Sequence, residues 1–300
     1  MANIFKRLLQ LFRYGSTLTR LIFINAGVFL TLRIIAVICH LGNIPDWQHA
    51  ILKYVELPSR PELLAMRPWT ILTYMFAQFD VLHIMFNMLW LYWFGAIFLS
   101  INTQKRLLAL YLFGGIGGGL VYFLAYNTLP ALIGINAGLI GASAAVIAIV
   151  VATAIMMPDY KVPLLFLGPV SLKWIAIATL AIDFLSITGQ NGGGHISHIG
   201  GALTGAAFAL AMRNGVDITA PFNRIIDKIV NLCRRLKAGS NPPRAKKSAK
   251  QSRPTAHAGS VSDQKTLDEI LDKIKKSGYT SLTPGERKTL FDVSSRIKQE

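Results

Sequence analysis

The chain has 300 residues, of which 52% are hydrophobic and only 15% charged, and its net charge is +16. An average soluble chain has about 25% charged residues. The charges are also unevenly spread: residues 81–104 and 107–158 contain none, and residues 174–212 contain only Asp183. A soluble globular domain cannot cover its surface with so much uncharged chain, so that class is excluded, as are a disordered chain and a disulfide-rich secreted scaffold.

Six apolar windows are long enough to cross a membrane, because a helix needs about 20 apolar residues to span roughly 30 Å of hydrocarbon. In chain order the windows cover about 21–42, 81–102, 107–126, 138–157, 169–188 and 195–213. The first is too apolar over too great a length for a cleaved signal peptide. We therefore expect an all-α, polytopic membrane protein with a six-helix bundle over residues 21–214.

The Lys and Arg residues predict the orientation of this bundle. Residues 1–20, the loops after the second and fourth windows, and the whole chain beyond residue 212 are basic. The loop at 43–80 has no basic excess, and the two remaining loops have no Lys or Arg. All basic segments lie on one side if both termini are cytoplasmic. The positive charge is therefore assigned to a membrane surface, with no nucleic acid partner.

The chain beyond the last window divides into three parts. Residues 215–238 form an expected basic amphipathic helix, which would lie on the inner leaflet. Residues 239–262 are rich in Ser, Pro, Lys, Ala and Gly and are expected to be a disordered linker. Residues 263–300 are expected to form a small helical hairpin. Its second helix would begin at a capping box, Thr283-Pro284-Gly285-Glu286.

Polar side chains inside membrane spans are costly, so each is a candidate functional residue. Three windows begin with such groups: His83 and Asn87, Gly141-Ala142-Ser143-Ala144, and His195-Ile196-Ser197-His198. In the predicted topology these three windows all run from outside to inside. Their polar groups therefore share one depth, with Ser143 expected about five residues, or about 8 Å, below the start of its helix.

A serine and a histidine at one depth predict acyl transfer. The Ser143 hydroxyl is a weak nucleophile until a base removes its proton, and His198 is a suitable base. His83 and Asn87 are spaced i,i+4 and so share a helix face, from which both could donate to an oxyanion. The Ser143 backbone N–H, near a helix N-terminus, could provide a third donor.

These motifs resemble those of the rhomboid family of intramembrane serine proteases, over roughly residues 20–213. The family motifs read here, in the order of the second, fourth and sixth windows, as His83…Asn87, Gly141-Ala142-Ser143-Ala144 and His198…Gly201…Gly205. The resemblance implies Ser143 as nucleophile and His198 as base, in a dyad without an acid. It implies His83 and Asn87 as oxyanion partners and places Gly141 beside them. It also implies a membrane-dipping first loop and, for the bacterial type, the inner membrane.

The sequence departs from the family motifs at two places, and the resemblance assigns no role to three further residues, His195, Asp183 and Arg33. Ala144 replaces the last Gly of the serine motif, and Arg67-Pro68-Trp69 stands where the family often has Trp-Arg. His195 is expected to be a loop residue or a supporting residue beside the site. Asp183 could touch the cavity, but a packing or interfacial role is favoured. Arg33, inside the first window, is assigned no function.

The predicted substrate is a single-pass membrane protein, cut near the outer end of its transmembrane helix. Such a helix hides its scissile carbonyl, so helix-weakening residues and a small residue before the cut are expected. The glycine-rich segment 189–194 is the expected flexible cover. No metal and no organic cofactor are predicted, and the oligomeric state cannot be read from the sequence.

Two other functions are compatible with a polytopic membrane protein of this kind. A catalytically inactive rhomboid-like protein could bind transmembrane clients, but the presence of both Ser143 and His198 argues against it. A small transporter or channel is disfavoured because the inner halves of the fourth and sixth windows are apolar, which predicts a blind cavity.

Overall fold

The computed structural model describes residues 2–164, 168–189 and 191–238, together with residues 270, 272–275, 282–283, 285–287 and 290 of the tail. The chain forms two compact units, Met1–Lys237 and Ala238–Glu300, and each is described by itself.

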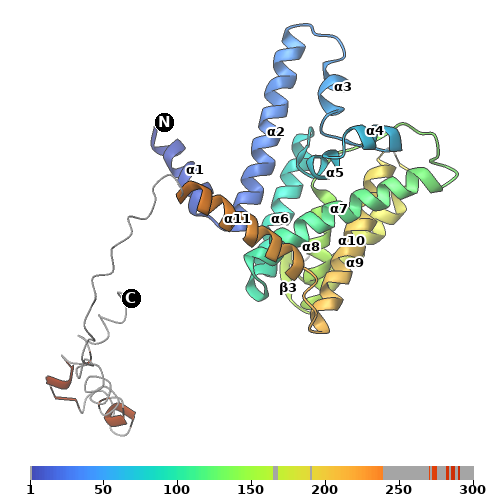
Figure 1. Cartoon of the computed structure of the whole chain (residues 1–300). Helices are drawn as coiled ribbons and strands as arrows, with labels where there is room; N and C mark the ends of the chain where they lie inside the picture. The colour runs from blue at the N-terminus through green and yellow to red at the C-terminus, as the bar shows by residue number, and fades with distance from the viewer. Residues whose placement is uncertain are drawn as a thin grey trace, which may run out of the picture. The chain divides into compact units, whose positions relative to one another are not determined.

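The first unit is built from helices, and each of the six predicted spans is represented by one (Figure 1). The six are α2 (Thr17–Leu41), α6 (Val81–Ile101), α7 (Gln104–Thr128), α8 (Ser143–Met156), α9 (Leu172–Leu185) and α10 (Gly192–Arg213). Two helices flank them: α1 (Ala2–Tyr14), which the sequence analysis did not predict, and α11 (Ala220–Ala238), which it did. The all-α fold class is confirmed.

Not all six helices are long and apolar enough to cross a membrane. Among the described residues, α2, α6 and α7 qualify by length and composition, whereas α8 and α9 have only 14 residues each. The fourth and fifth windows were predicted too long, because their first residues form strands rather than helix. These strands are β2 (Gly138–Leu139) and β4 (Gly168–Ser171), and the latter pairs antiparallel with β3 (Lys161–Leu164).

The start of α8 also corrects the predicted depth of the serine. Ser143 is the first residue of α8, not the fifth. Gly141 has φ +130°, a backbone conformation that cannot continue a helix, and its N–H donates to the carbonyl of Tyr74 at 3.0 Å. The polypeptide therefore enters α8 through a turn that ends immediately before Ser143.

Side-chain caps fix where several helices begin. Ser16, Asp80 and Thr103 precede α2, α6 and α7, and each accepts a hydrogen bond from a backbone N–H three residues on. The Asp80 cap determines that His83 is the third residue of α6 and that Asn87 lies one turn later, on the same face.

Small residues let α7, α8 and α10 approach closely at the centre of the bundle. A Cβ atom added to Gly201 or Gly205 of α10 would collide with the backbone of Ala144 or Ala148 of α8. Small residues at such an interface let two helix backbones approach closely. The additional methyl of Ala144 faces Gly118 of α7, where an added Cβ would lie 2.5 Å from the Ala144 Cβ. Because residue 118 of α7 is a glycine, the methyl of Ala144, which departs from the family motif, fits against α7.

The first loop packs into the bundle through its second half. It contains α3 (Trp47–Leu52), β1 (Leu57–Pro58), α4 (Pro61–Met66), α5 (Thr70–Thr73) and a 3₁₀ turn, η1 (Tyr74–Phe76). β1 pairs antiparallel with β2, placing Leu57 opposite Leu139. Tyr74, Met75 and Ala77 are fully buried. The loop is thereby tied to the segment that leads into Ser143.

Arg67 and Trp69 hold the earlier part of this loop. Arg67 Nη1 donates to the carbonyl of Lys53 at 2.7 Å, and Trp69 Nε1 donates to the carbonyl of Tyr54 at 3.0 Å. The Arg67 guanidinium also lies over the Tyr54 ring, 5.7 Å from its centroid. The reversed Arg-Pro-Trp order therefore places both side chains on adjacent carbonyls of the same loop.

Basic residues gather at the end of the bundle opposite the starts of α6, α8 and α10. Arg106 and Arg213 line one cavity there, with the last residues of α6, α8 and α10. Arg106 Nε contacts Asp217 Oδ2 at 2.9 Å, and Lys105 Nζ contacts Asp227 Oδ1 at 2.7 Å. The second of these ion pairs attaches α11 to the start of α7.

In the second unit, the predicted capping box is present. The Thr283 N–H donates to Glu286 Oε2 at 2.7 Å, and the Glu286 N–H donates to Thr283 Oγ1 at 3.4 Å. Lys273 Nζ contacts Glu286 Oε1 at 2.8 Å. Lys273, with Thr283, lowers the pKa of Glu286 to about 2. The predicted linker at 239–262 lies outside the described residues, as does most of the hairpin.

Candidate active site

One cavity of about 230 Å³ collects polar residues from four helices. It is lined by His83, Phe86, Asn87 and Trp90 of α6, Ser143, Val146 and Ile147 of α8, Thr179 and Asp183 of α9, and His198 of α10. The four polar residues singled out in the second, fourth and sixth windows are thus brought together. A larger cavity, of about 700 Å³, is lined mainly by apolar residues of α8, α9 and α10 and by none of these four.

Ser143 and His198 are in direct contact. Ser143 Oγ lies 2.7 Å from Nε2 of His198, across the close α8–α10 interface. As the first residue of α8, Ser143 presents both its hydroxyl and a backbone N–H that has no acceptor within the helix. His198 lies in the second turn of α10 and is largely buried. This geometry fits a nucleophile and its base.

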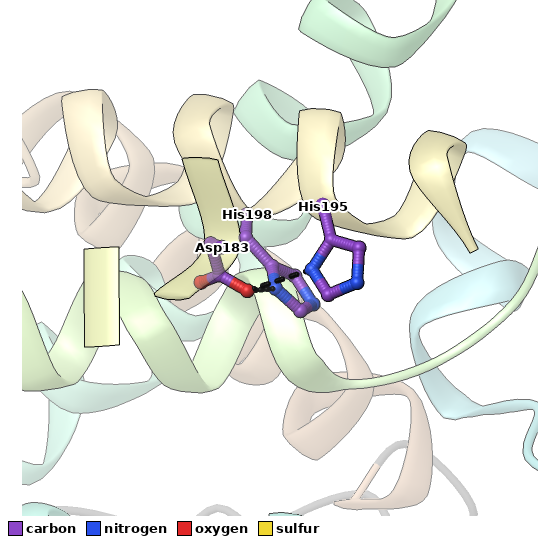
Figure 2. A group of neighbouring side chains, drawn as sticks. All are labelled: Asp183, His195 and His198. Atoms are coloured by element: carbon purple, nitrogen blue, oxygen red, sulfur yellow. Dashed lines mark hydrogen bonds and ion pairs between the residues drawn. The ribbon is translucent and has the colours of Figure 1, made fainter. Parts of the chain in front are cut away.

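A carboxylate contacts the other nitrogen of the same histidine, which the expected dyad lacked. Asp183 Oδ1 lies 2.8 Å from Nδ1 of His198 and 2.9 Å from Nδ1 of His195 (Figure 2). Asp183 is near the end of α9, and both histidines lie in the first two turns of α10, the next helix along the chain. Asp183 therefore lines the cavity, the placement that the sequence analysis considered but did not favour. His195 is a helical residue beside the site, not a loop residue.

Asp183, His195 and His198 also have the residue types of a metal site, and one ligand atom from each lies within 4.8 Å of the others. Ligands about 2.1 Å from a tetrahedral ion would lie roughly 3.4 Å apart. The measured N–O separations of 2.8 and 2.9 Å are shorter, and they are ordinary distances for N–H···O hydrogen bonds. The geometry therefore favours two histidines that donate to one carboxylate oxygen.

Asn87 is held by a buried chain of polar groups that the sequence analysis missed. Asn87 Nδ2 donates to Gln78 Oε1 at 2.7 Å, and Gln78 Nε2 donates to Asn25 Oδ1 at 3.2 Å. Asn25 Nδ2 in turn donates to the Tyr111 hydroxyl at 2.9 Å. Asn25, an amide inside the first apolar window, was the available signal. Because an amide nitrogen carries two hydrogens, Asn87 keeps one that Gln78 does not use.

Gly141 lies between His83 and Ser143. A Cβ added to Gly141 would be 3.3 Å from His83 Nε2 and 3.6 Å from Ser143 Oγ. The missing side chain thus brings the backbone close to both groups, and the positive φ of +130° favours glycine independently. The expected grouping of Gly141 with His83 is present in the structure.

The predicted cover at 189–194 differs from expectation. Gly192, Gly193 and Gly194 form the first turn of α10 rather than a loop, and Gln190 lies outside the described residues. A Cβ on Gly193 would lie 3.0 Å from the Tyr122 ring, so this turn packs tightly against α7. Gly193 therefore allows the start of α10 to pack closely against α7.

Comparison with known proteins supports one family. A family model described as Rhomboid domain matches residues 65–215, and a second, described as a family of unknown function (DUF6576), matches residues 260–296. RHOMBOID-like protein 12, mitochondrial, of Arabidopsis thaliana is 29% identical over 208 residues, which are 65% of this chain and 58% of that protein. Presenilin-associated rhomboid-like protein A, mitochondrial, of Danio rerio is 29% identical over 134 residues, 43% of this chain and 34% of that protein.

The chain thus spans less than two thirds of the length of either relative. Both relatives are mitochondrial by name, so the predicted bacterial inner membrane has no support from them. The Rhomboid match covers just over half of the chain and includes every helix that lines the Ser143–His198 cavity. The chain belongs to the rhomboid family and is an integral membrane protein.

Proposed function

We propose that the protein is an intramembrane serine endopeptidase, with Ser143 as nucleophile and His198 as general base. The observation that carries this proposal is the 2.7 Å contact between Ser143 Oγ and His198 Nε2 inside an accessible cavity. Ser143 is the first residue of α8, so no preceding carbonyl of that helix can accept from its hydroxyl, and the hydroxyl contacts the imidazole of His198 instead. A serine hydroxyl beside an imidazole nitrogen is the pairing that nucleophilic catalysis uses.

The reaction follows from these two side chains. As Ser143 Oγ attacks the scissile carbonyl carbon, His198 Nε2 takes the hydroxyl proton. His198 then gives that proton to the departing amide nitrogen, which leaves an acyl ester on Ser143. A water molecule, deprotonated by His198, attacks the ester. The proton returns to Ser143 Oγ as the new carboxyl terminus is released.

The negative oxygen of the tetrahedral intermediate needs donors that are in place beforehand. The N-terminus of α8 provides the Ser143 N–H and the positive end of the helix dipole. Asn87 provides an amide hydrogen that Gln78 does not use, and His83 Nε2 lies near Gly141 on the same side. His83, Asn87 and Ser143 line one cavity, which supports an oxyanion site there.

The small volume of the cavity supports the expectation that the substrate has a small residue just before the scissile bond. The cavity holds only about 230 Å³, and its apolar surface comes from Phe86, Trp90, Val146 and Ile147. The substrate in this proposal is a single-pass membrane protein, cut near the outer end of its helix, with both termini of the enzyme on the cytoplasmic side. The clustering of Arg106 and Arg213 at the opposite end of the bundle supports that orientation.

A serine-reactive fluorophosphonate tests the proposal without a known substrate. The purified full chain should be labelled in liposomes, and peptide mapping should place the label on Ser143. His198→Ala should prevent labelling. Ser100→Ala should not, because Ser100 is exposed near the far end of α6 and bonds to its own helix at the Ile97 carbonyl. Lack of labelling of the folded wild type would favour the alternative, an inactive protein that binds transmembrane clients.

A further inference from the structure

We infer that Asp183 is the positioning residue of the active site, which orients His198 and completes a Ser143–His198–Asp183 triad. The inference rests on the proposed function, since it assigns a role in the same reaction. It departs from the dyad without an acid that the sequence resemblance implied.

The hydrogen-bond pattern gives the physical reason. An ionised carboxylate can only accept, so the 2.8 Å contact requires that His198 carry its hydrogen on Nδ1. In a neutral imidazole Nε2 is then bare, and it can accept the Ser143 proton across 2.7 Å. When His198 becomes positively charged during the reaction, the same carboxylate stabilises that charge. Asp183 therefore acts on Ser143 only through His198.

The surroundings of Asp183 point to a functional role rather than a stabilising one. It is the only charged residue between 174 and 212, and its side chain is 7% exposed. Its Oδ2 atom is buried and has no hydrogen-bond partner among the described residues. A buried carboxylate with an unpaired oxygen costs folding free energy, and a neutral side chain of the same shape would avoid part of that cost.

His195 holds the carboxylate in place. Its Nδ1 contacts the same Oδ1 atom as His198, and the two rings are nearly perpendicular, with centroids 5.6 Å apart. Both contacts therefore converge on one oxygen, which limits rotation of the carboxylate. His195 is not among the residues that line the Ser143 cavity, so its influence on turnover should be weaker than that of Asp183.

The decisive variant is Asp183→Asn, which preserves shape but can donate from its amide and so favours the wrong His198 tautomer. We expect kcat for a reporter transmembrane substrate to fall by about 10²- to 10⁴-fold, with KM nearly unchanged. The thermal unfolding midpoint should stay the same or rise. Asp159→Asn is the matched control, because Asp159 is an exposed acid that pairs with Lys173 at the other end of α9, and it should retain wild-type turnover.

¹⁵N NMR of the full-length protein labelled with ¹⁵N-histidine measures the tautomer of His198 directly. The wild type should show His198 protonated on Nδ1, and Asp183→Asn should shift the proton toward Nε2. His195→Gln should preserve the His198 signal and lower kcat less than Asp183→Asn does. A chelator should leave wild-type turnover unchanged. If chelation instead abolished turnover and Zn²⁺ restored it, the three side chains would form a metal site and the inference would be overturned.

The failures of this inference and of the proposed function are distinguishable. If the wild type cleaves and Asp183→Asn cleaves within about threefold of it, the triad is wrong and the serine protease stands. If Asp183→Asn lowered the unfolding midpoint enough to account for its whole loss of turnover, Asp183 would have a structural role. That result would also overturn the inference. If the wild type does not cleave at all, the proposed function fails. The NMR tautomer then still decides whether Asp183 orients His198.

Discussion

Ser143 Oγ lies 2.7 Å from Nε2 of His198, although 55 positions separate the two residues in the chain. The contact depends on the packing of α8 against α10, where Gly201 and Gly205 leave no side chain between the two backbones. Helix packing by small residues therefore brings the Ser143 hydroxyl within reach of the His198 imidazole.

The proposed oxyanion donors, His83 and Asn87, should affect kcat more than substrate binding. His83→Ala and Asn87→Ala are each expected to slow turnover without abolishing it. Loss of one such donor costs roughly 2.7–4 kcal/mol, or about 10²–10³ in kcat, and the Ser143 N–H remains to limit the loss. Steady-state kinetics on a reporter transmembrane helix measure the effect. Unchanged kcat in both variants would mean that the two residues have only a structural role.

Gln78 should act through Asn87. Gln78→Met removes the 2.7 Å contact that holds the Asn87 amide and should lower kcat by less than Asn87→Ala does. Because the two residues form one chain of hydrogen bonds, the double variant should be no slower than Asn87→Ala alone. A double-mutant cycle provides the measurement. Strictly additive losses would show that Gln78 affects the reaction independently of Asn87.

Gly141→Ala should impair both stability and turnover. The new methyl is forced into a backbone conformation with φ +130° and lies beside His83 and Ser143, and such strain costs on the order of 1–3 kcal/mol. Gly134→Ala is the matched control. Gly134 also has a positive φ, but an added Cβ there meets nothing within 4 Å. The thermal unfolding midpoint should fall in both variants. The value of kcat per folded molecule should fall only in Gly141→Ala.

Truncation should separate the tail from the chemistry. A chain ending after Gly239 keeps α11 and should retain full activity per folded molecule. A chain ending after Gly215 loses the Arg106–Asp217 and Lys105–Asp227 ion pairs and the ring contact of Phe113 with Phe222, so its yield should fall. Yield and specific activity in detergent measure both effects. Lost specific activity in the longer truncation would show that the tail is coupled to the site.

Hydropathy and residue spacing predicted the six main helices and the meeting of His83, Asn87, Ser143 and His198. These features follow from local patterns, because apolar length gives spans and i,i+4 spacing gives a common face. The start of α8 was missed because Gly138 and Leu139 are as apolar as helix but pair with β1. Hydropathy alone does not distinguish those two states.

The hydrogen-bond partners of the proposed catalytic residues were harder to predict. Asp183 was visible as an isolated charge in an apolar stretch, but only the packing of α9 on α10 shows that it meets His198 rather than the membrane interface. Likewise, the Asn25–Gln78–Asn87 chain joins α2, the first loop and α6 through contacts 53 and 9 positions apart. Such contacts depend on tertiary structure, which spacing along one helix does not encode.

The most direct test of the account is cleavage of a reporter transmembrane helix in liposomes by the full-length chain. The reporter should carry a small residue and a nearby Gly or Pro at its outer end, and mass spectrometry should locate the cut. We expect cleavage at that end by the wild type and by Ser100→Ala. Ser143→Ala and His198→Ala should fold and insert but fall below about one-tenth of wild-type turnover. Cleavage above that level by either folded variant would contradict a mechanism based on Ser143 and His198.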